Sequence, residues 1–177
     1  MKFRDLKEDD IEVRVQSVKK NGIVLLLYKN ARVDMNILDE TVGPENWSRE
    51  HYDCKGNLFC TVAINVNYTT PGTEPRWVEK SDCGSESNTE AEKGEASDSF
   101  KRACVNWGIG RELYTAPFIW VPADKCNLSD GKCYDKFKVE KVKIVDKKIV
   151  AISIINTSKT GDKGAPTRAF VMFEQVQ

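Results

Sequence analysis

The segment KGEASDSFKRACVNWGIGR, which runs from Lys93 to Arg111, combines residues that could bind an anion. Lys101 and Arg102 are adjacent, and two neighbouring cations could follow the phosphates of a nucleic-acid backbone. The other interpretation is a solvated helix face, on which Asp98 and Arg102 form an i, i+4 ion pair that contributes about 0.3–0.5 kcal/mol. The residue types alone favour the solvated face, because a phosphate-binding rim needs a second basic element nearby.

Two other segments could supply that second basic element. Arg32 stands at the start of an expected helix, although an arginine in this position is usually just exposed. A lysine cluster between residues 132 and 148 is the other candidate. Charge runs on edge strands more often block aggregation, and the residues alone favour that role for this cluster.

Few residues point to catalysis or to a cofactor. His51 is the one histidine, and it has no evident nucleophile to serve as a base, so we expect a surface or hydrogen-bonded side chain. No glycine-rich loop ends in Gly-Lys-Ser/Thr, as a phosphate-cradling loop would. Gly108 and Gly110 resemble the start of a dinucleotide fingerprint, but they follow a helix where that fingerprint follows a strand. We therefore expect a protein that is not an enzyme and needs no cofactor.

The cysteines suggest reduced thiols rather than a disulfide framework or a metal site. Cys104 falls in an expected helix and Cys60 in an expected strand. Cys126 and Cys133 are the nearest approach to metal-ligand spacing, and six intervening residues are weak evidence for zinc. We expect partly buried free thiols in a cytosolic protein and no bound metal.

Length and charge limit the possibilities further. The chain has 177 residues, so we expect a single domain over residues 1–177. Lys plus Arg and Asp plus Glu number 27 each, and any anion-binding surface must therefore be a local patch. We find no secretory signal and no apolar run near the roughly 18 residues that a membrane helix needs, which favours a cytoplasmic location.

The first elements follow from periodicity and turn residues. Alternation over residues 11–16, an apolar run over 23–28 and the Asn-Gly pair between them predict a β-hairpin. A helix follows, with Asn30 as its N-cap and Gly43 as its C-cap. Period-two patterns then predict an antiparallel meander of three strands, at about residues 47–54, 57–69 and 75–82.

The second half contains another helix and more strands. Thr89 and Glu92 form a possible capping box, as do Ser87 and Glu90, for a helix that runs to Trp107. Its apolar stripe includes Ala96, Phe100, Ala103, Cys104 and Trp107. Strands are predicted in the tail at residues 118–121, 137–145, 149–156 and 169–173, with a hairpin turn at 146–148.

Two stretches together resemble the Rad-fifty-two/Rad-twenty-two type of single-strand annealing proteins, including the prophage members of that superfamily. The first is YKNARVDMNILDETVGPENWS, which is similar to a family helix that carries an arginine at its start. The second is KGEASDSFKRACVNWGIG, in which an aromatic-Gly follows Lys-Arg-Ala at the family's offset. The three-stranded meander lies between them, and the resemblance covers about residues 10–115.

This resemblance implies an α+β fold. Its core, about residues 10–115, would be an antiparallel three-stranded meander packed on a long helix, a strand–strand–strand–helix arrangement like that of double-stranded-RNA-binding domains. Residues 116–177 would form a strand-rich extension with a C-terminal β-hairpin. The resemblance also implies assembly of identical chains into a ring or helical filament.

The functional implication is ATP-independent annealing of complementary single strands of DNA in homologous recombination and repair. The family's groove arginine falls on Arg32, and its Lys-Arg pair on Lys101 and Arg102. An upstream basic position falls on Lys93. A further arginine of the eukaryotic branch falls on Val105 here, and Arg111 is our candidate for supplying that charge. A single-strand-binding protein is an expected partner.

A second hypothesis of a different class stays open. In this alternative the chain keeps the fold but is a non-catalytic interaction module, which binds a protein partner through its lysine-rich C-terminal strands. The salt dependence of binding discriminates between the two hypotheses. Affinity that depends on several phosphate contacts falls steeply as the salt concentration rises, whereas the affinity of a packed protein interface barely changes.

Overall fold

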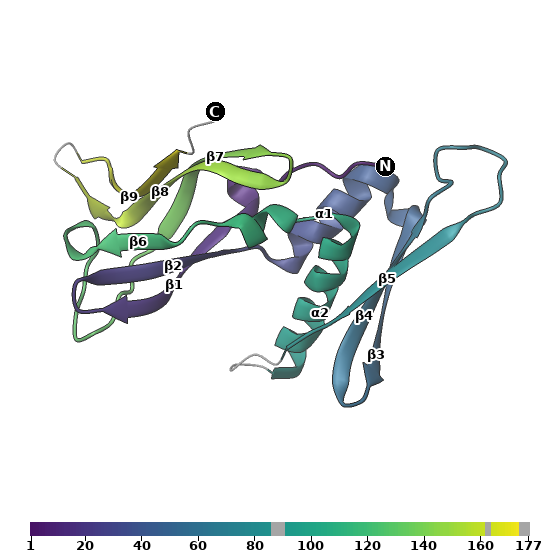
Figure 1. Cartoon of the computed structure of the whole chain (residues 1–177), viewed down its shortest axis with the longest axis horizontal. Coiled ribbons are helices and arrows are strands. Elements are labelled where there is room, and N and C mark those ends of the chain that lie inside the picture. Colours follow the sequence, from purple (N-terminus) through teal and green to yellow (C-terminus); the bar gives the residue numbers. More distant parts are fainter. Residues whose placement is uncertain (86–90, 162–163, 174–177) are drawn as a thin grey trace. The chain divides into compact units, whose positions relative to one another are not determined.

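A computed structural model describes residues 1–85, 91–161 and 164–173, with the side chains of 91–93 left aside. The fold is α+β, with antiparallel sheets and, in the described residues, two α-helices (Figure 1). The chain divides into two compact units. Unit 1 comprises Met1–Arg4 and Asn30–Gly110, and unit 2 comprises Asp5–Lys29 and Arg111–Gln177.

Helix α1, Ala31–Val42, opens unit 1 where the sequence predicted it. The Asn30 side chain accepts a hydrogen bond from the backbone N–H of Arg32 at 2.9 Å, so Asn30 is the N-cap. Gly43 ends the helix at a φ of 85°, a conformation that favours glycine. A short 3₁₀ turn, η2 (Pro44–Asn46), then leads into the sheet.

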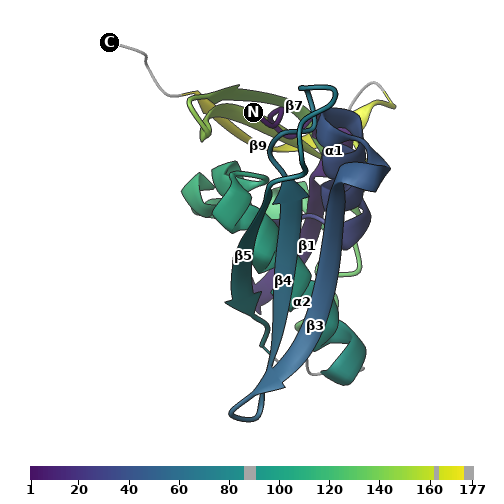
Figure 2. The ribbon, with the colours of Figure 1, turned by 90° about the vertical axis from the view of Figure 1, so that its right-hand side faces the viewer.

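The sheet of unit 1 has the order β3-β4-β5, with antiparallel neighbours, and α2 packs against it (Figure 2). Its strands are β3 (Trp47–Cys54), β4 (Asn57–Asn65) and β5 (Trp77–Cys83). Strand β4 ends four residues earlier than predicted. The side chain of Asn65 accepts hydrogen bonds from the backbone N–H groups of Asn67 and Arg76, at 3.1 and 3.0 Å, so the chain turns there.

Helix α2, Ala91–Trp107, buries the predicted stripe against this sheet. Phe100 is fully buried and stacks on Trp47 of β3, and Nε1 of Trp107 donates to the carbonyl of Val62 at 3.0 Å. The helix ends at Gly108, with a φ of 98°. Both predicted capping boxes lie outside the described residues.

Unit 2 is built around a six-stranded sheet of order β6-β2-β1-β7-β8-β9. Its strands are β1 (Glu12–Lys19), β2 (Gly22–Tyr28), β6 (Ile119–Pro122), β7 (Phe137–Val145), β8 (Lys148–Thr160) and β9 (Pro166–Phe173). Three 3₁₀ turns complete the unit: η1 (Glu8–Asp10), η3 (Arg111–Thr115) and η4 (Ala123–Lys125). In the described part of the chain, no helix is both long and apolar enough to cross a bilayer.

The first hairpin belongs to this sheet rather than to the meander. Strand β1 pairs with β7 at two positions, Glu12 with Lys138 and Val13 with Phe137. The sheet topology joins β1 and β2 to the C-terminal strands, and the core of about residues 10–115 stays a prediction. Strand pairing between distant segments leaves no local pattern in the sequence, whereas the hairpin itself does.

Gly22 has a different role from the one its Asn-Gly context predicts. The turn lies at residues 20–21, and Gly22 is the first residue of β2, where it pairs with Pro122 of β6. A Cβ atom on Gly22 would lie 2.4 Å from the carbonyl oxygen of Val121. The glycine is thus required for the close approach of two strands, not for the conformation of a turn.

Candidate nucleic-acid interface

Arg102 lies on the β5 flank of α2. Its Nε is 3.5 Å from a carboxylate oxygen of Asp82 in β5, and both side chains are partly exposed. One helical turn further on, Asn106 donates to the carbonyl of Ser81 at 3.0 Å. Asp98 on the same flank accepts hydrogen bonds from the backbone and the hydroxyl of Ser85, both at 3.1 Å. Asp82 is thus an acidic partner of Arg102.

Lys101 points to a different side of α2. Successive helical residues are turned by about 100° around the axis, so Lys101 does not share the direction of Arg102. It adjoins Phe100, whose ring contacts Trp47 and Arg49 of β3. The pair that is adjacent in the sequence therefore points to two different sides of α2.

Arg32 belongs to the same unit as this pair. It is the second residue of α1 and is exposed, and α1 contacts both α2 and β3. Arg32 and Lys101 thus come from elements that contact one another. Arg102 comes from the same helix but faces β5.

Two cations of the sheet were missed by sequence reasoning. Arg49 lies over the Phe100 ring at 4.7 Å, and Lys80 over the Trp107 ring at 4.6 Å, where its Nζ also donates to the carbonyl of Asn106 at 2.8 Å. The signal for Arg49 was its two-residue spacing from Trp47, which places both on the face of β3 that packs on α2. Arg49 remains exposed beyond this contact, so it adds positive charge on the β3 side.

The other two predicted DNA-binding residues are Lys93 and Arg111. Lys93 lies in the first turn of α2, and its side chain is outside the described part of the structure. Arg111 is exposed and begins η3 in unit 2.

Side chains with other chemistry have structural partners. Nε2 of His51 lies 3.0 Å from the carbonyl oxygen of Ala96, so the predicted hydrogen-bonded histidine is confirmed. All six cysteines are free, and burial raises the pKa of Cys60 and of Cys126 to about 11. Such thiols stay protonated near neutral pH and are poor nucleophiles. Among the described residues, no three His, Cys, Asp or Glu side chains are grouped to hold a metal ion.

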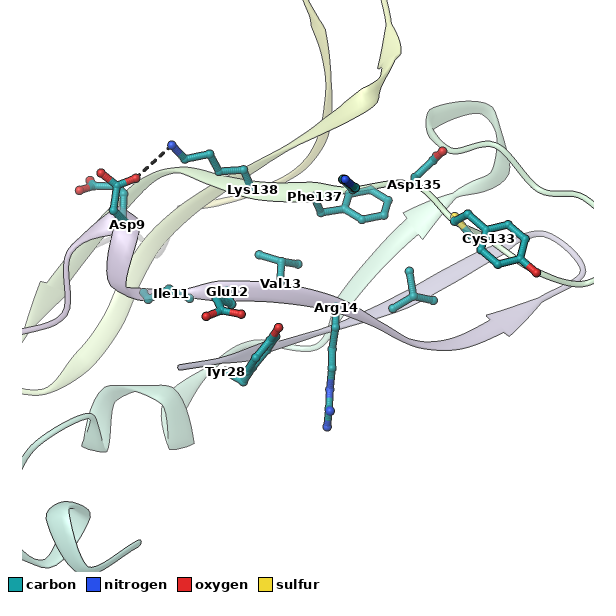
Figure 3. A pocket seen from close by; sticks show the side chains of 14 residues that line it. Asp9, Ile11, Glu12, Val13, Arg14, Tyr28, Cys133, Asp135, Phe137 and Lys138 are labelled. Carbon is teal, nitrogen blue, oxygen red and sulfur yellow. Dashed lines mark ion pairs between the residues drawn. The ribbon is translucent and has the colours of Figure 1, made fainter. Parts of the chain in front are cut away.

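Unit 2 contains a cleft of about 620 Å³ where β1 and β7 diverge (Figure 3). Arg14 lies over the Tyr28 ring at 5.4 Å, and a hydrogen bond with Glu12 raises the pKa of Tyr28. Lys138 pairs with Asp9 at 3.0 Å at the same edge. Side chains of both charges therefore line the cleft. Cys133 also lines it, and burial raises the pKa of this thiol, so Cys133 is not an activated nucleophile.

Comparison with known proteins places the sequence motifs in a family. The model of the Rad52/22 family of double-strand break repair proteins matches residues 3–127, well over half of the chain. The chain belongs to this family. The family match includes both helices and the meander, and it ends before β7.

A relative in Deinococcus radiodurans is similar over part of the chain. It is named single-stranded DNA-binding protein DdrA, and it is 34% identical over 110 residues, which are 61% of this chain and 49% of the relative. The aligned region thus spans about half the length of this curated relative. No solved structure matches the chain.

Proposed function

We propose that this member of the Rad52/22 family binds single-stranded DNA and anneals complementary strands without ATP, in recombination and repair. The observation that supports it best is the cation set on unit 1: exposed Arg32 and Arg49 with Lys101 on contacting elements, and Arg102 on a different side of α2. The relative's name, a single-stranded DNA-binding protein, points to the same ligand.

In this mechanism the packing of α2 directs the charges. Buried Phe100 and the Trp107 hydrogen bond fix the rotation of the helix on the sheet, and hence the directions of Lys101 and Arg102. Phosphate contacts hold a strand without reading its sequence. Base pairing then carries the specificity, while the protein supplies charge and alignment and performs no covalent chemistry.

We also propose the finer features of this function. The meander with α2 acts as a core like that of double-stranded-RNA-binding domains, and Lys93 and Arg111 add to the DNA contacts. Identical chains assemble into a ring or filament, so that many weak sites act together on one strand. A single-strand-binding protein is the expected partner on DNA.

The first experiment measures annealing of two complementary oligonucleotides, one carrying a dye and the other a quencher, without nucleotide or metal. Wild type is compared with Lys101→Ala/Arg102→Ala, after circular dichroism has verified folding. The matched control is Lys19→Ala/Lys20→Ala, another adjacent and exposed basic pair. We expect fast annealing by wild type and by the control, and loss in the Lys101/Arg102 variant.

Other outcomes discriminate between function and site. No acceleration by wild type would refute annealing. Equal acceleration by all three proteins would keep the function and move the site to Arg32 and Arg49. Because Lys101 and Arg102 point to different sides of α2, the two single variants show which of them contacts DNA. Light scattering tests assembly, for which a particle of one chain's mass is the contrary result.

The second candidate function is the interaction module that binds a protein partner through the lysine-rich C-terminal strands. It is favoured by the exposed lysines of β7, which lie beyond the family match. Wild type that neither binds nor anneals single strands, at any salt concentration, would favour this candidate.

A further inference from the structure

One face of the C-terminal strands gathers basic side chains that are scattered in the sequence. Cross-strand partners in an antiparallel sheet share a face. Lys138 pairs with Ile155, which pairs with Arg168; Lys141 pairs with Ser153, which pairs with Val171; and Lys143 pairs with Ala151, which pairs with Phe173. We call these nine residues the β7–β9 face.

Two β-bulges bring these residues to one side. In a regular strand, residues three apart point to opposite faces. The register shifts between Val139 and Lys141, so Lys138 and Lys141 both share the face of their β8 partners. A second shift, between Ile154 and Ile155 of β8, does the same for Arg168 and Val171 of β9. Bulges re-aim side chains in this way, and here they align three lysines.

The cations of this face are exposed and only partly neutralised. The side chains of Lys138 and Arg168 are 59% and 63% exposed, and Lys141 and Lys143 are exposed as well. Glu140 is a carboxylate on the same face, and it lies 3.4 Å from Arg168. A hydrogen bond from Ser153 Oγ lowers the pKa of Glu140, so it stays charged. Among the described residues, four cations therefore outnumber the one carboxylate of this face, and Asp9 pairs with Lys138 at its margin.

The role of blocking edge-to-edge aggregation fits these lysines poorly. Strand β7 lies between β1 and β8 in the sheet order, and it pairs with β8 from Phe137 to Val145. Along its other side, the backbone N–H of Val142 donates to Glu8 of η1 at 3.2 Å. Only Lys138 of the three lysines has a partner on β1, Glu12, while Lys141 and Lys143 lie where β8 alone pairs with β7. All three project from the sheet face that they share with Arg168 of β9, whereas protection of an edge requires charges only along that edge.

We propose that the β7–β9 face binds the sugar–phosphate backbone of single-stranded nucleic acid, at a site separate from the cations of unit 1. Lysines at alternate strand positions stand about 7 Å apart and can contact successive phosphates of an extended strand. Phe173, which is 77% exposed in the third row, offers an aromatic surface for base stacking. The ligand class is that of the proposed function, and this surface lies beyond the family match.

The test is performed in the Lys101→Ala/Arg102→Ala background, so that the unit 1 site contributes little. Binding of a fluorescent oligo-dT is followed by anisotropy as salt is varied. The face variant is Lys138→Glu/Lys141→Glu/Lys143→Glu. Its control is Lys7→Glu/Lys19→Glu/Lys20→Glu, which changes the net charge equally at exposed positions of the same unit. Thermal melting verifies that all variants fold.

We expect the face variant to bind at least about tenfold more weakly than the control, with a salt slope reduced by about 2, since each single-strand phosphate contact contributes about 0.7. Phe173→Ala, which changes no charge, is expected to weaken binding about tenfold. Equal binding by the face variant and the control would overturn the proposal and leave these lysines to a protein partner. If the face variant fails to fold, two milder variants replace it, Phe173→Ala and Lys141→Gln/Lys143→Gln. Unchanged binding by both of them overturns the proposal.

This proposal and the proposed function can fail separately. Both variants are also made separately in the otherwise wild-type chain. If Lys101→Ala/Arg102→Ala loses binding and the face variant binds normally, the unit 1 site is supported and the β7–β9 face is refuted. The reverse pattern would support the face and move DNA binding away from α2.

Discussion

Asp82 weakens the ability of Arg102 to bind a phosphate. The two side chains lie 3.5 Å apart, so a phosphate must compete with the carboxylate for the guanidinium. Lys101 points to a different side of α2, and among the described residues it forms no ion pair. Two adjacent residues of the same charge therefore differ in how readily they can bind DNA, and the difference arises from their neighbours in the sheet.

Replacing Asp82 should strengthen DNA binding if Arg102 contacts phosphate. Exposed ion pairs contribute about 0.2–1 kcal/mol, so Asp82→Asn is expected to tighten single-strand binding about twofold to fivefold at low salt. Anisotropy titration measures the change. The control is Glu79→Gln, which makes the same charge change on the opposite face of β5. Equal affinities of the two variants would show that Arg102 does not contact the strand.

Asp135 should make the stability of unit 2 dependent on pH. Partial burial alone would raise the pKa of Asp135, but hydrogen bonds from the backbone of Asn127 and from the side chains of Asn156 and Asn127 outweigh it and lower the pKa. A lowered folded-state pKa means that this stabilisation is present above the unfolded pKa of about 3.9 and is lost as pH falls through the folded value.

We therefore expect Asp135→Asn to cost about 1–3 kcal/mol at pH 6, since a partly buried network loses one of its two acceptor oxygens, and an NH2 donor then faces the donors of Asn127 or Asn156. The difference from wild type should shrink as the pH falls below about 4. Urea unfolding at several pH values measures both effects. A difference that stays constant between pH 6 and pH 3 would contradict the assignment to the carboxylate.

At the scale of elements, the pairing of β2 with β6 depends on the absence of a side chain. Gly22→Ala would place a Cβ 2.4 Å from the Val121 carbonyl oxygen, so one strand must move. Overpacking of this kind costs about 1–3 kcal/mol. Gly161→Ala is the control, because its Cβ would lie 3.8 Å from the nearest atom, an ordinary contact. Urea unfolding measures the loss in free energy of unfolding of each variant. Similar losses would show that β6 can shift to make room for the Cβ atom at little cost.

Elements defined by short-range patterns were predicted well. Helix α1 lies between its predicted caps, and the turn at Asp146 and Lys147 has the positive φ angles, 49° and 62°, of a tight hairpin. Strand ends were predicted less well, as in β4, where one asparagine side chain replaces backbone pairing. The bulges in β7 and β9 were not predicted at all, because they show only when the register of both partners is known.

At the scale of the whole molecule, a chain with zero formal net charge can attract DNA only through local patches of positive charge. If Arg32, Lys101 and Arg102 each contact a phosphate, the slope of log affinity against log salt should be about −2 per site. Affinity should then fall roughly twentyfold between 50 and 200 mM salt. Titrations across this range test it. A slope near zero would indicate stacking or a packed interface instead.

The sequence by itself determined the helices, most turns and the apolar stripe of α2, because caps, glycines and periodicity act over a few neighbouring residues. It also carried the motifs that the family model matches. Only the tertiary structure assigned the first hairpin to the C-terminal sheet, paired Arg102 with Asp82, and aligned the lysines of β7 with Arg168 and Phe173. Each of these depends on which distant strands pair and in which register, and that choice follows from burying whole faces together rather than from any local pattern.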